Sequence, residues 1–437
     1  MSSSAPDPAR PPRALLLGPV YASSEIKGMP SALGEVVEQL QARGWQVDVQ
    51  IWAASAQRAA GEPPASAGWV STTVARRPSI LDRHPGLFAL WTRAVPQSLR
   101  RLISLSLRPK TYFESQSHNL HVAEGLLADA RAYDVVLLSI DEAAPGPGAL
   151  LTARVDRVAI ISLYNLAEEI SAGHYRWLRW VARWRVGRGL HPFLFRSISP
   201  AQVRLALLAS NLWREQALQA GLPSDRARTI YFGVPQPPAP PRPRVGGHRI
   251  LVVGRLSQDK GAHLLLRSLP CIQAALPGVR VTIIAGPGPT GYRRLLDKMI
   301  RTASLEQVVT ITPGRARAAL QANYAAHDVL FFYSIYAEPV ALVLMEAFAA
   351  GLPVAASAAQ AGSALVRHQE TCLCYNPRSA HSLADVMITL LTDSALQTRL
   401  AANAQRLVRE KFTLEKMGQE YDAVLREFIG RPGAAHA

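Results

Sequence analysis

The sequence predicts an α/β protein built from two Rossmann-like halves in tandem. A strand, a turn and a helix open the chain at Ala14, and the same succession recurs at Ile250. Two apolar runs in the first half, 133–140 and 158–163, lack alternating polar residues, as parallel strands covered on both faces do. The repetition of this unit predicts two parallel sheets, one in each half of the chain.

Length and composition agree with a globular protein of this size. The chain has 437 residues, enough for two or three domains with complete cores, and its hydrophobic content of 49% argues against disorder. The three cysteines, Cys271, Cys372 and Cys374, are too few for a disulfide framework, which favours free thiols in a reducing cytosol. No apolar run reaches the roughly 18 residues that a membrane span needs, so no transmembrane segment is predicted.

The first half is expected to span residues 14–234, after a disordered Pro/Ser-rich tail at 1–13. Its strands are predicted at 14–17, 44–49, 133–140, 158–163, 203–209 and 228–234, and its clearest helices at 31–43 and 211–220. Ser210 is the predicted N-cap of the second of these helices. The six prolines of the stretch 235–244 predict an extended, semi-rigid linker.

The second half is expected to span residues 245–413. Its strands are predicted at 250–253, 281–285, 308–312 and 328–332, and its helices after Gly261 and at 341–350, 383–391 and 396–411. Gly254 is predicted to open a turn, and the Gly/Pro-rich stretch 286–291 a loop. A last helix is predicted near 414–428.

Two glutamates, Glu338 and Glu346, lie in the otherwise apolar stretch 336–354. Helix-forming residues at 341–350, followed by a Gly-Leu-Pro stop, place Glu346 on a short buried helix and Glu338 in the loop before it. A buried carboxylate without a partner is costly, so each glutamate must meet hydrogen-bond donors from the protein or from a ligand. One interpretation is purely structural, with Glu338 as a helix cap and Glu346 in a core ion pair.

The stretch 249–270 favours a ligand instead. A buried strand, a glycine and the start of a helix after Lys260 form an arrangement in which free N–H groups and the positive end of the helix dipole attract an anion. Arg255 and Lys260 add two cations. Two cations at a helix start and two buried carboxylates suit a ligand with a diphosphate at one end and hydroxyls at the other, such as a nucleotide sugar.

At these residues the sequence resembles glycosyltransferase family 4, enzymes of GT-B fold in which two Rossmann-like domains face each other across a cleft. Gly254-Arg255-Leu256 followed by Lys260-Gly261, the pair Glu338 and Glu346 with seven residues between them, and the segment 349–354 carry the resemblance. It covers the second half nearly end to end. It implies nucleotide-sugar binding by domain 245–413 and a C-terminal helix, 414–430, that crosses back to the first domain.

The resemblance also implies roles for single residues. Arg255 and Lys260, with Gly254 in the preceding turn, would hold the donor diphosphate. Glu346 would hold the ribose hydroxyls and Glu338 the transferred sugar. The resemblance also implies transfer with retention of configuration. No Asp-x-Asp metal motif is present, so no metal or other cofactor is expected.

The chain departs from the family pattern at three places. Where a Gly-Gly pair is usual in the second half, Gln360-Ala361 stands, with Gly362 and Ser363 just beyond as donor-side candidates. In the first loop only Gly28 remains of the usual paired glycines, after Lys27. Tyr164-Asn165 replaces the usual His-Asp; both side chains can hydrogen-bond hydroxyls, yet neither is a ready base at neutral pH.

A basic segment at 174–196 has six arginines and no acid. On a helix its tryptophans and arginines would lie side by side, and this combination is typical of a membrane interface: Trp177, Trp180 and Trp184 beside Arg176, Arg179 and Arg183. The alternative is a helix whose tryptophans pack in the domain core while the arginines are solvated. The net charge of +16 is compatible with anionic lipid, phosphorylated substrates or nucleic acid and does not choose among them.

Together these features predict a cytoplasmic nucleotide-sugar-dependent hexosyltransferase, peripheral at the inner face of the cell membrane. It would transfer a sugar to a glycan or lipid-linked acceptor in the synthesis of a cell-surface polysaccharide or glycolipid. The alternative, motivated by Tyr164-Asn165, is a GT-B protein that binds a sugar nucleotide or glycan without transfer. A nucleic-acid partner is not expected, because stacking and groove-reading motifs are missing and the buried glutamates would stay unexplained.

Overall fold

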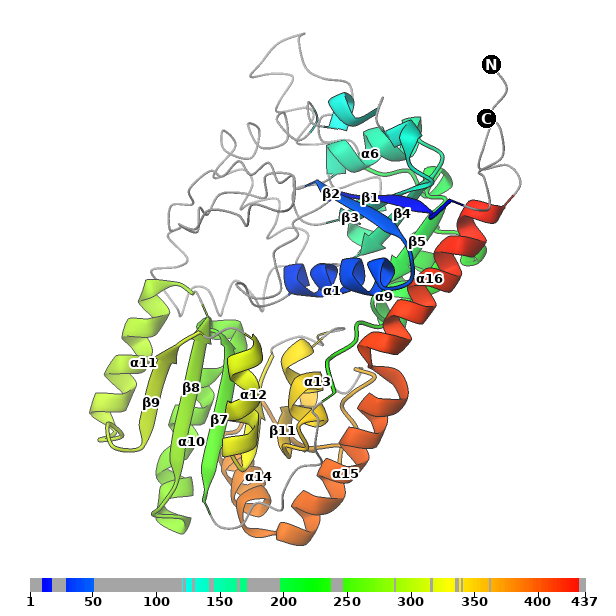
Figure 1. The fold of residues 1–437 in the computed structure, drawn as a ribbon. Coiled ribbons are helices and arrows are strands. Elements are labelled where there is room, and N and C mark those ends of the chain that lie inside the picture. The colour runs from blue at the N-terminus through cyan, green and yellow to red at the C-terminus, as the bar shows by residue number, and fades with distance from the viewer. Residues whose placement is uncertain are drawn as a thin grey trace, which may run out of the picture.

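The computed structural model contains two six-stranded parallel sheets with helices packed around them (Figure 1). It describes residues 10–17, 29–50, 120, 123–127, 130–140, 145–162, 166–170, 197–236, 247–286, 288–314, 317–334, 338, 341–360 and 363–431. The expected α/β class with two Rossmann-like units is confirmed.

The first sheet has the strand order β2-β1-β3-β4-β5-β6, all parallel. Its strands are β1 (Arg13–Leu17), β2 (Gln46–Gln50), β3 (Val135–Ile140), β4 (Val158–Ser162), β5 (Leu205–Leu208) and β6 (Ala227–Thr229). Its described helices are α1 (Met29–Gln41), α6 (Pro145–Arg154), α7 (Leu166–Ile170) and α9 (Asn211–Gln219). Ser210 caps α9 as predicted, since its Oγ accepts a hydrogen bond from the Trp213 N–H.

The second sheet has the order β12-β11-β10-β7-β8-β9 and is also parallel. Its strands are β7 (Arg249–Arg255), β8 (Arg280–Gly286), β9 (Val309–Pro313), β10 (Val329–Phe332), β11 (Val354–Ser357) and β12 (Leu373–Tyr375). Its helices are α10 (Ala262–Ala275), α11 (Thr290–Thr302), α12 (Arg317–Ala326), α13 (Leu342–Ala349), α14 (Ala380–Thr392) and α15 (Ser394–Lys411). The chain ends with α16 (Leu414–Gly430).

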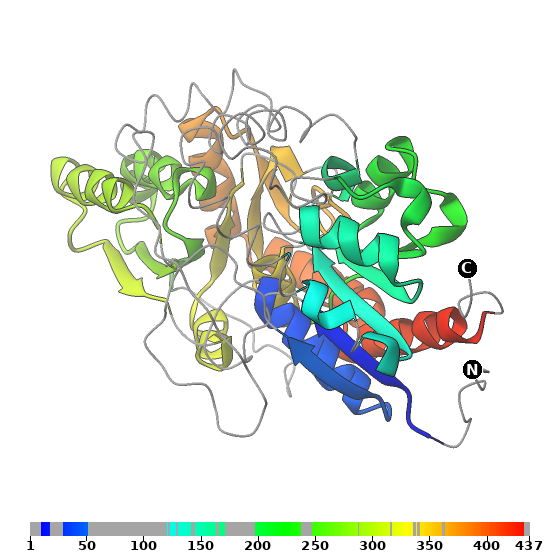
Figure 2. The ribbon, with the colours of Figure 1, turned by 90° about the horizontal axis from the view of Figure 1, so that it is seen from above.

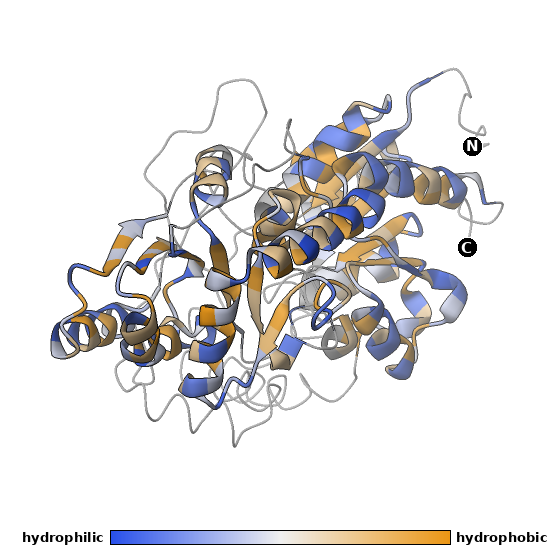
Figure 3. Cartoon of the chain, turned by 90° about the horizontal axis from the view of Figure 1, so that it is seen from below, coloured by the Kyte–Doolittle hydropathy of each residue, from blue (hydrophilic) through white to orange (hydrophobic). Residues whose placement is uncertain are grey.

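Burial on both faces explains why these strands are apolar throughout. In β1, Ala14 and Leu16 belong to one buried cluster and Leu15 and Leu17 to another, so neighbouring residues fill opposite sides of the sheet. In a view coloured by hydropathy the strands are mostly orange, whereas the outer helices carry both colours (Figure 3). A surface helix needs only one apolar face, which accounts for the difference.

Some predicted boundaries were wrong. Gly254 does not open a turn, because β8 continues alongside and β7 keeps a pairing partner up to Arg255. The predicted loop 286–291 ends early, since α11 already begins at Thr290. Helices α6, α7, α11 and α12 and the short strand β12 were not predicted. The first strand begins at Arg13, and Arg10, which was placed in the tail, binds Asp134 with a 2.7 Å ion pair.

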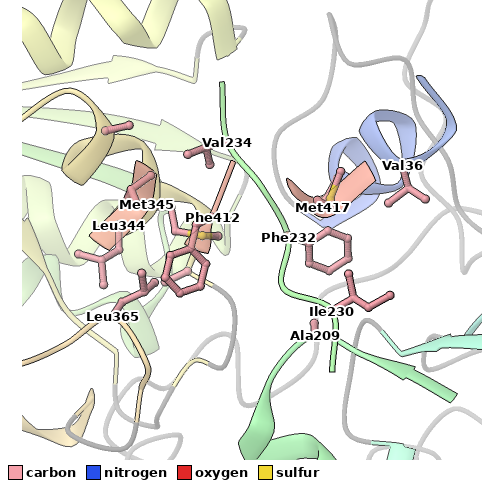
Figure 4. Packing of buried hydrophobic residues seen from close by; sticks show 14 of the residues in the cluster. Val36, Ala209, Ile230, Phe232, Val234, Leu344, Met345, Leu365, Phe412 and Met417 are labelled. Atoms are coloured by element: carbon pink, nitrogen blue, oxygen red, sulfur yellow. The ribbon is translucent and has the colours of Figure 1, made fainter. Parts of the chain in front are cut away.

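Two chain segments run side by side where the chain passes between the sheets. The Val234 N–H donates to the Phe412 carbonyl at 2.9 Å, and Val234 forms a parallel bridge with Thr413. Phe232, Phe412 and Met417 pack here with apolar residues of both halves (Figure 4). A Cβ at Gly233 would lie 2.4 Å from the Thr413 backbone, so only glycine permits this approach.

Helix α16 packs on α1 of the first half and extends from the second half, as the ribbon views show (Figures 1 and 2). Trp45 Nε1 donates to the Asp422 carboxylate at 2.6 Å, and the Arg43 guanidinium pairs with Glu415 at 2.8 Å. These contacts join the last helix to the first βαβ unit. Among the described residues, the 230–234 segment and α16 both carry contacts between the two halves.

Candidate functional site

The strand order of the second sheet reverses its direction between the two central strands, β7 and β10. From β7 the chain moves to β8 on one side, while β10, on the other side of β7, leads on to β11. In open parallel sheets such a reversal leaves a crevice at the carboxyl ends of the two central strands, and ligands bind there. Lys260 follows β7 and Glu338 follows β10, so the sequence-predicted residues lie at this switch point.

Lys260 and Glu338 form an ion pair at the switch point. The Lys260 Nζ donates to Glu338 Oε1, and both side chains are largely covered, with 22% and 15% of their surface exposed. The family resemblance assigns the two residues to opposite ends of the donor. The structure instead brings them into contact, so a cation and a carboxylate neutralise each other at the site.

The connection between Lys260 and helix α10 depends on a glycine, Gly261. Gly261 has a φ of 63°, a left-handed conformation in which it follows the short 3-10 turn Gln258–Lys260 and precedes α10. A Cβ at this position would lie 2.0 Å from Tyr333 Cδ1. Both the backbone conformation and the close ring therefore require glycine, and together they fix where Lys260 leaves the main chain.

Arg255 is more exposed than Lys260. It is the last residue of β7, its side chain is 62% exposed, and its guanidinium contacts the Asp259 carboxylate at 3.4 Å. Gly254 lies beside it within the strand, paired with Ala285 of β8. Both predicted diphosphate-binding cations thus lie near the end of β7, and each has a carboxylate partner.

Glu346 has a different environment. It lies on α13 with only 4% of its surface exposed, and its Oε2 accepts a 2.7 Å hydrogen bond from the Tyr324 hydroxyl. Tyr324 comes from α12 and is fully buried. The sequence predicted the buried helix and its glutamate but not this partner, because α12 itself was not predicted.

Gln360 is the residue at this site whose role the sequence did not indicate. Its Oε1 accepts a 2.8 Å hydrogen bond from the Glu338 N–H, and its Nε2 donates to the Ser334 carbonyl at 3.4 Å. The only signal in the sequence was that Gln360-Ala361 departs from the family's Gly-Gly. Nearby, Ser363 Oγ accepts from the Leu365 N–H and so caps a local turn.

His263 lies one residue into α10, close to Lys260 in the sequence. The His263 N–H donates to the Tyr292 Oη at 3.1 Å, and this hydroxyl lies 2.9 Å from His263 Nδ1. The Tyr292 hydroxyl therefore contacts both the main chain and the ring of His263. Burial lowers the pKa of His263 to about 4, with a further contribution from Arg267, so the ring is neutral at pH 7.

A pocket of about 480 Å³ lies beside the start of α10, near the carboxyl ends of β10 and β12. It is lined by His263, Leu264, Arg267, Tyr333, Pro377 and Arg378. Tyr333 forms part of its wall and also contacts Gly261, so the pocket adjoins the turn that carries Lys260.

Several predicted site residues lie outside the described residues. They are Gly28, Tyr164, Asn165 and Gly362, together with the surface set Trp177, Trp180, Trp184, Arg176, Arg179 and Arg183. Within the described part of the chain, no three His, Cys, Asp or Glu side chains gather as a metal site would require. None of the helices described there combines the length and hydropathy of a membrane span.

Comparisons with known proteins place this site in context. Residues 239–407 match the family described as Glycosyl transferases group 1. Over 183 residues, 40% of this chain, it is 28% identical to a GDP-mannose-dependent alpha-(1-6)-phosphatidylinositol monomannoside mannosyltransferase of Mycobacterium tuberculosis. Over 161 residues, 36% of this chain, it is 31% identical to a D-inositol 3-phosphate glycosyltransferase of Rhodococcus erythropolis. The matches span 47% and 36% of these relatives, about half of their length or less.

Solved structures resemble nearly the whole chain. The structure of HepE from Anabaena in complex with UDP-glucose superposes with a TM-score of 0.61 at 19% identity, covering 95% of this chain and 99% of that one. Sucrose-phosphate synthase from Thermosynechococcus elongatus superposes with a TM-score of 0.64, also at 19% identity, covering 95% and 98%. This chain therefore has the GT-B fold, and its second half, which holds the Lys260–Glu338 and Tyr324–Glu346 pairs, matches the group 1 glycosyl transferases.

Proposed function

We propose that this protein is a retaining glycosyltransferase that moves a hexose from a nucleotide sugar to a glycan or lipid-linked acceptor. The observation that carries the proposal is the Lys260–Glu338 pair at the switch point of the second sheet. The pair combines a cation beside a helix start with a carboxylate in the loop after the neighbouring strand β10, as a ligand with a diphosphate and a sugar would require.

In this proposal the diphosphate replaces the carboxylates that the two cations contact in the free protein. Lys260 leaves Glu338 and Arg255 leaves Asp259, and both bind phosphate oxygens. Glu338 is then available to accept hydrogen bonds from the sugar hydroxyls, while Glu346 accepts from the ribose. During transfer the bond between the anomeric carbon and the diphosphate oxygen breaks, and an acceptor hydroxyl oxygen bonds to that carbon while its proton passes to the leaving diphosphate. The two cations stabilise the charge on the diphosphate.

A transfer assay tests the proposal. Wild-type protein incubated with a panel of UDP- and GDP-sugars and a bacterial lipid extract should yield a product heavier by one hexose, detected by mass spectrometry. Lys260→Ala, as the matched inactive control, should reduce the yield strongly. Binding of a nucleotide sugar without any product would favour the alternative of a binding protein, which the replacement of His-Asp by Tyr164-Asn165 motivates. The anomeric configuration of the product, read by NMR, decides retention.

We also propose that the acceptor is met at an anionic membrane surface. The support is the basic segment 174–196 and the similarity to the mycobacterial phosphatidylinositol monomannoside mannosyltransferase. Arginines near an anionic surface contribute about 1 kcal/mol each, weakened by salt. The protein should sediment with anionic but not neutral liposomes, and replacing Arg176, Arg179 and Arg183 with Glu should abolish this. Equal sedimentation of both proteins would exclude the segment as a membrane contact.

A further inference from the structure

Gln360 connects two loops at the carboxyl edge of the second sheet. It ends the 3-10 turn Ala358–Gln360 after β11, and none of its surface is exposed. Its carboxamide contacts two main-chain groups after β10, the Glu338 N–H and the Ser334 carbonyl. One buried side chain therefore contacts the main chain at both Ser334 and Glu338.

The orientation of this carboxamide is fixed by its partners. Oε1 faces an N–H donor and Nε2 faces a carbonyl acceptor. The flipped amide would set donor against donor and acceptor against acceptor inside the protein, where unsatisfied polar groups are costly. Gln360 thus acts as a rigid cross-link, which the small residues of a Gly-Gly pair would be unable to supply.

Glu338 is held from both neighbouring strands. In the order β11-β10-β7, Gln360 follows β11 and binds the Glu338 main chain, while Lys260 follows β7 and binds the Glu338 carboxylate. If a diphosphate draws Lys260 away, the Gln360 contact is the one of these two that remains. Its effect should then fall on ligand groups that Glu338 contacts.

We propose that Gln360 is a positioning residue that places Glu338 for the sugar of the donor, and so sets the preference of the site for a nucleotide sugar over the nucleoside diphosphate alone. This inference rests on the proposed function. It assigns a role to a residue that departs from the family pattern.

The test measures a ratio of affinities. The dissociation constants of UDP, GDP and a panel of their hexose derivatives are measured by calorimetry for wild type and Gln360→Met, which keeps the side-chain length and removes both hydrogen bonds. We expect the preference for the sugar-bearing ligand to fall about tenfold, as the loss of two hydrogen bonds at a positioned group implies. Affinity for the nucleoside diphosphate itself should change little.

Gln397→Met is the matched control. Gln397 is also buried in the second half and donates from Nε2 to the Leu390 carbonyl, between α15 and α14. Its substitution carries the same chemical change away from Glu338 and should leave the ratio unchanged. An equal loss of affinity for both ligands in Gln360→Met would show a structural role and overturn the inference.

A measurement on wild-type protein covers the case in which Gln360→Met does not fold. Hydrogen exchange of the Glu338 amide should be slow both without ligand and with UDP, because Gln360 accepts from it in both states; fast exchange with UDP would overturn the inference. If wild-type protein binds neither ligand class, the proposed function fails as well. If it binds both and the ratio stays constant on substitution, only the role of Gln360 fails.

Discussion

Glu338 and Glu346 are close in sequence, but their carboxylates differ in exposure and in the partners described for them. Glu338 meets the Lys260 ammonium at the partly exposed edge of the sheet, whereas Glu346 meets the neutral hydroxyl of Tyr324 in the interior. The Lys260 and Glu338 side chains keep 22% and 15% of their surface exposed, so a ligand can reach the pair and replace one of its partners. Glu346, with only 4% of its surface exposed, is held in place by its surroundings. In the proposed function, Glu338 therefore exchanges its partner for the ligand, whereas Glu346 keeps a fixed position.

The largest expected change in ligand affinity comes from removing the cation of the Lys260–Glu338 pair. Lys260→Ala should weaken nucleoside diphosphate binding by about 2 to 3 kcal/mol, as expected for a lost charge-assisted contact. Calorimetry with UDP and GDP measures this. Lys298→Ala on α11 is a control of the same charge and should leave the affinity unchanged. An unaltered affinity in Lys260→Ala would remove Lys260 from the donor site.

The contrast between charged and neutral groups extends to His263, whose pKa of about 4 in the folded protein lies below its ordinary value of 6.5. Because the unfolded chain binds the proton more readily, the free energy of unfolding depends on pH. The contribution of the neutral His263 ring is complete above pH 6.5 and is lost as the pH falls toward 4. After a discount for partial exposure, the loss amounts to about 2 kcal/mol. Denaturant unfolding from pH 7 to pH 4 should show this loss in wild type and less of it in His263→Gln. Parallel curves for the two proteins would contradict the assignment.

The hydrogen bond between Tyr324 and Glu346 is tested by Tyr324→Phe, which removes the hydroxyl and keeps the ring. The free energy of unfolding should fall by about 1 to 2 kcal/mol, because a buried carboxylate oxygen loses a donor. Urea unfolding at pH 7 measures the change. A loss below the error of the measurement would mean that the Tyr324 hydroxyl does not hold Glu346.

The smallest expected effect is a gain in affinity, caused by removing the carboxylate of Glu338. Glu338→Gln should strengthen binding of a nucleoside diphosphate several-fold, or by about 1 kcal/mol, because Lys260 no longer has a competing carboxylate. Binding of the nucleotide sugar should gain less, since Glu338 is also proposed to contact the sugar. Calorimetry with UDP and UDP-hexoses measures both values. Weaker binding of UDP in Glu338→Gln would show that the ion pair supports the site and does not compete with the ligand.

The elements that the sequence predicted correctly are those whose signal is local. Apolar runs such as 158–163 predicted parallel strands because burial on both faces forbids polar residues there. Ser210 predicted a helix start through its own hydroxyl. Helices α11 and α12 and strand β12 were missed: α11 follows a Gly/Pro-rich stretch and β12 is only three residues long, so their local patterns are weak.

The α/β class, the two tandem units and the charged residues near the end of β7 and before α13 could be predicted from the sequence, because each depends on residues close together in the chain. The partners of these charged residues depend on the tertiary structure. Lys260 and Glu338 are 78 positions apart, and Gln360 lies 22 positions from Glu338. These contacts exist because β10 pairs between β7 and β11, so that loops from three strands meet at one edge. Strand order depends on how whole layers pack, and no short stretch of sequence contains that information.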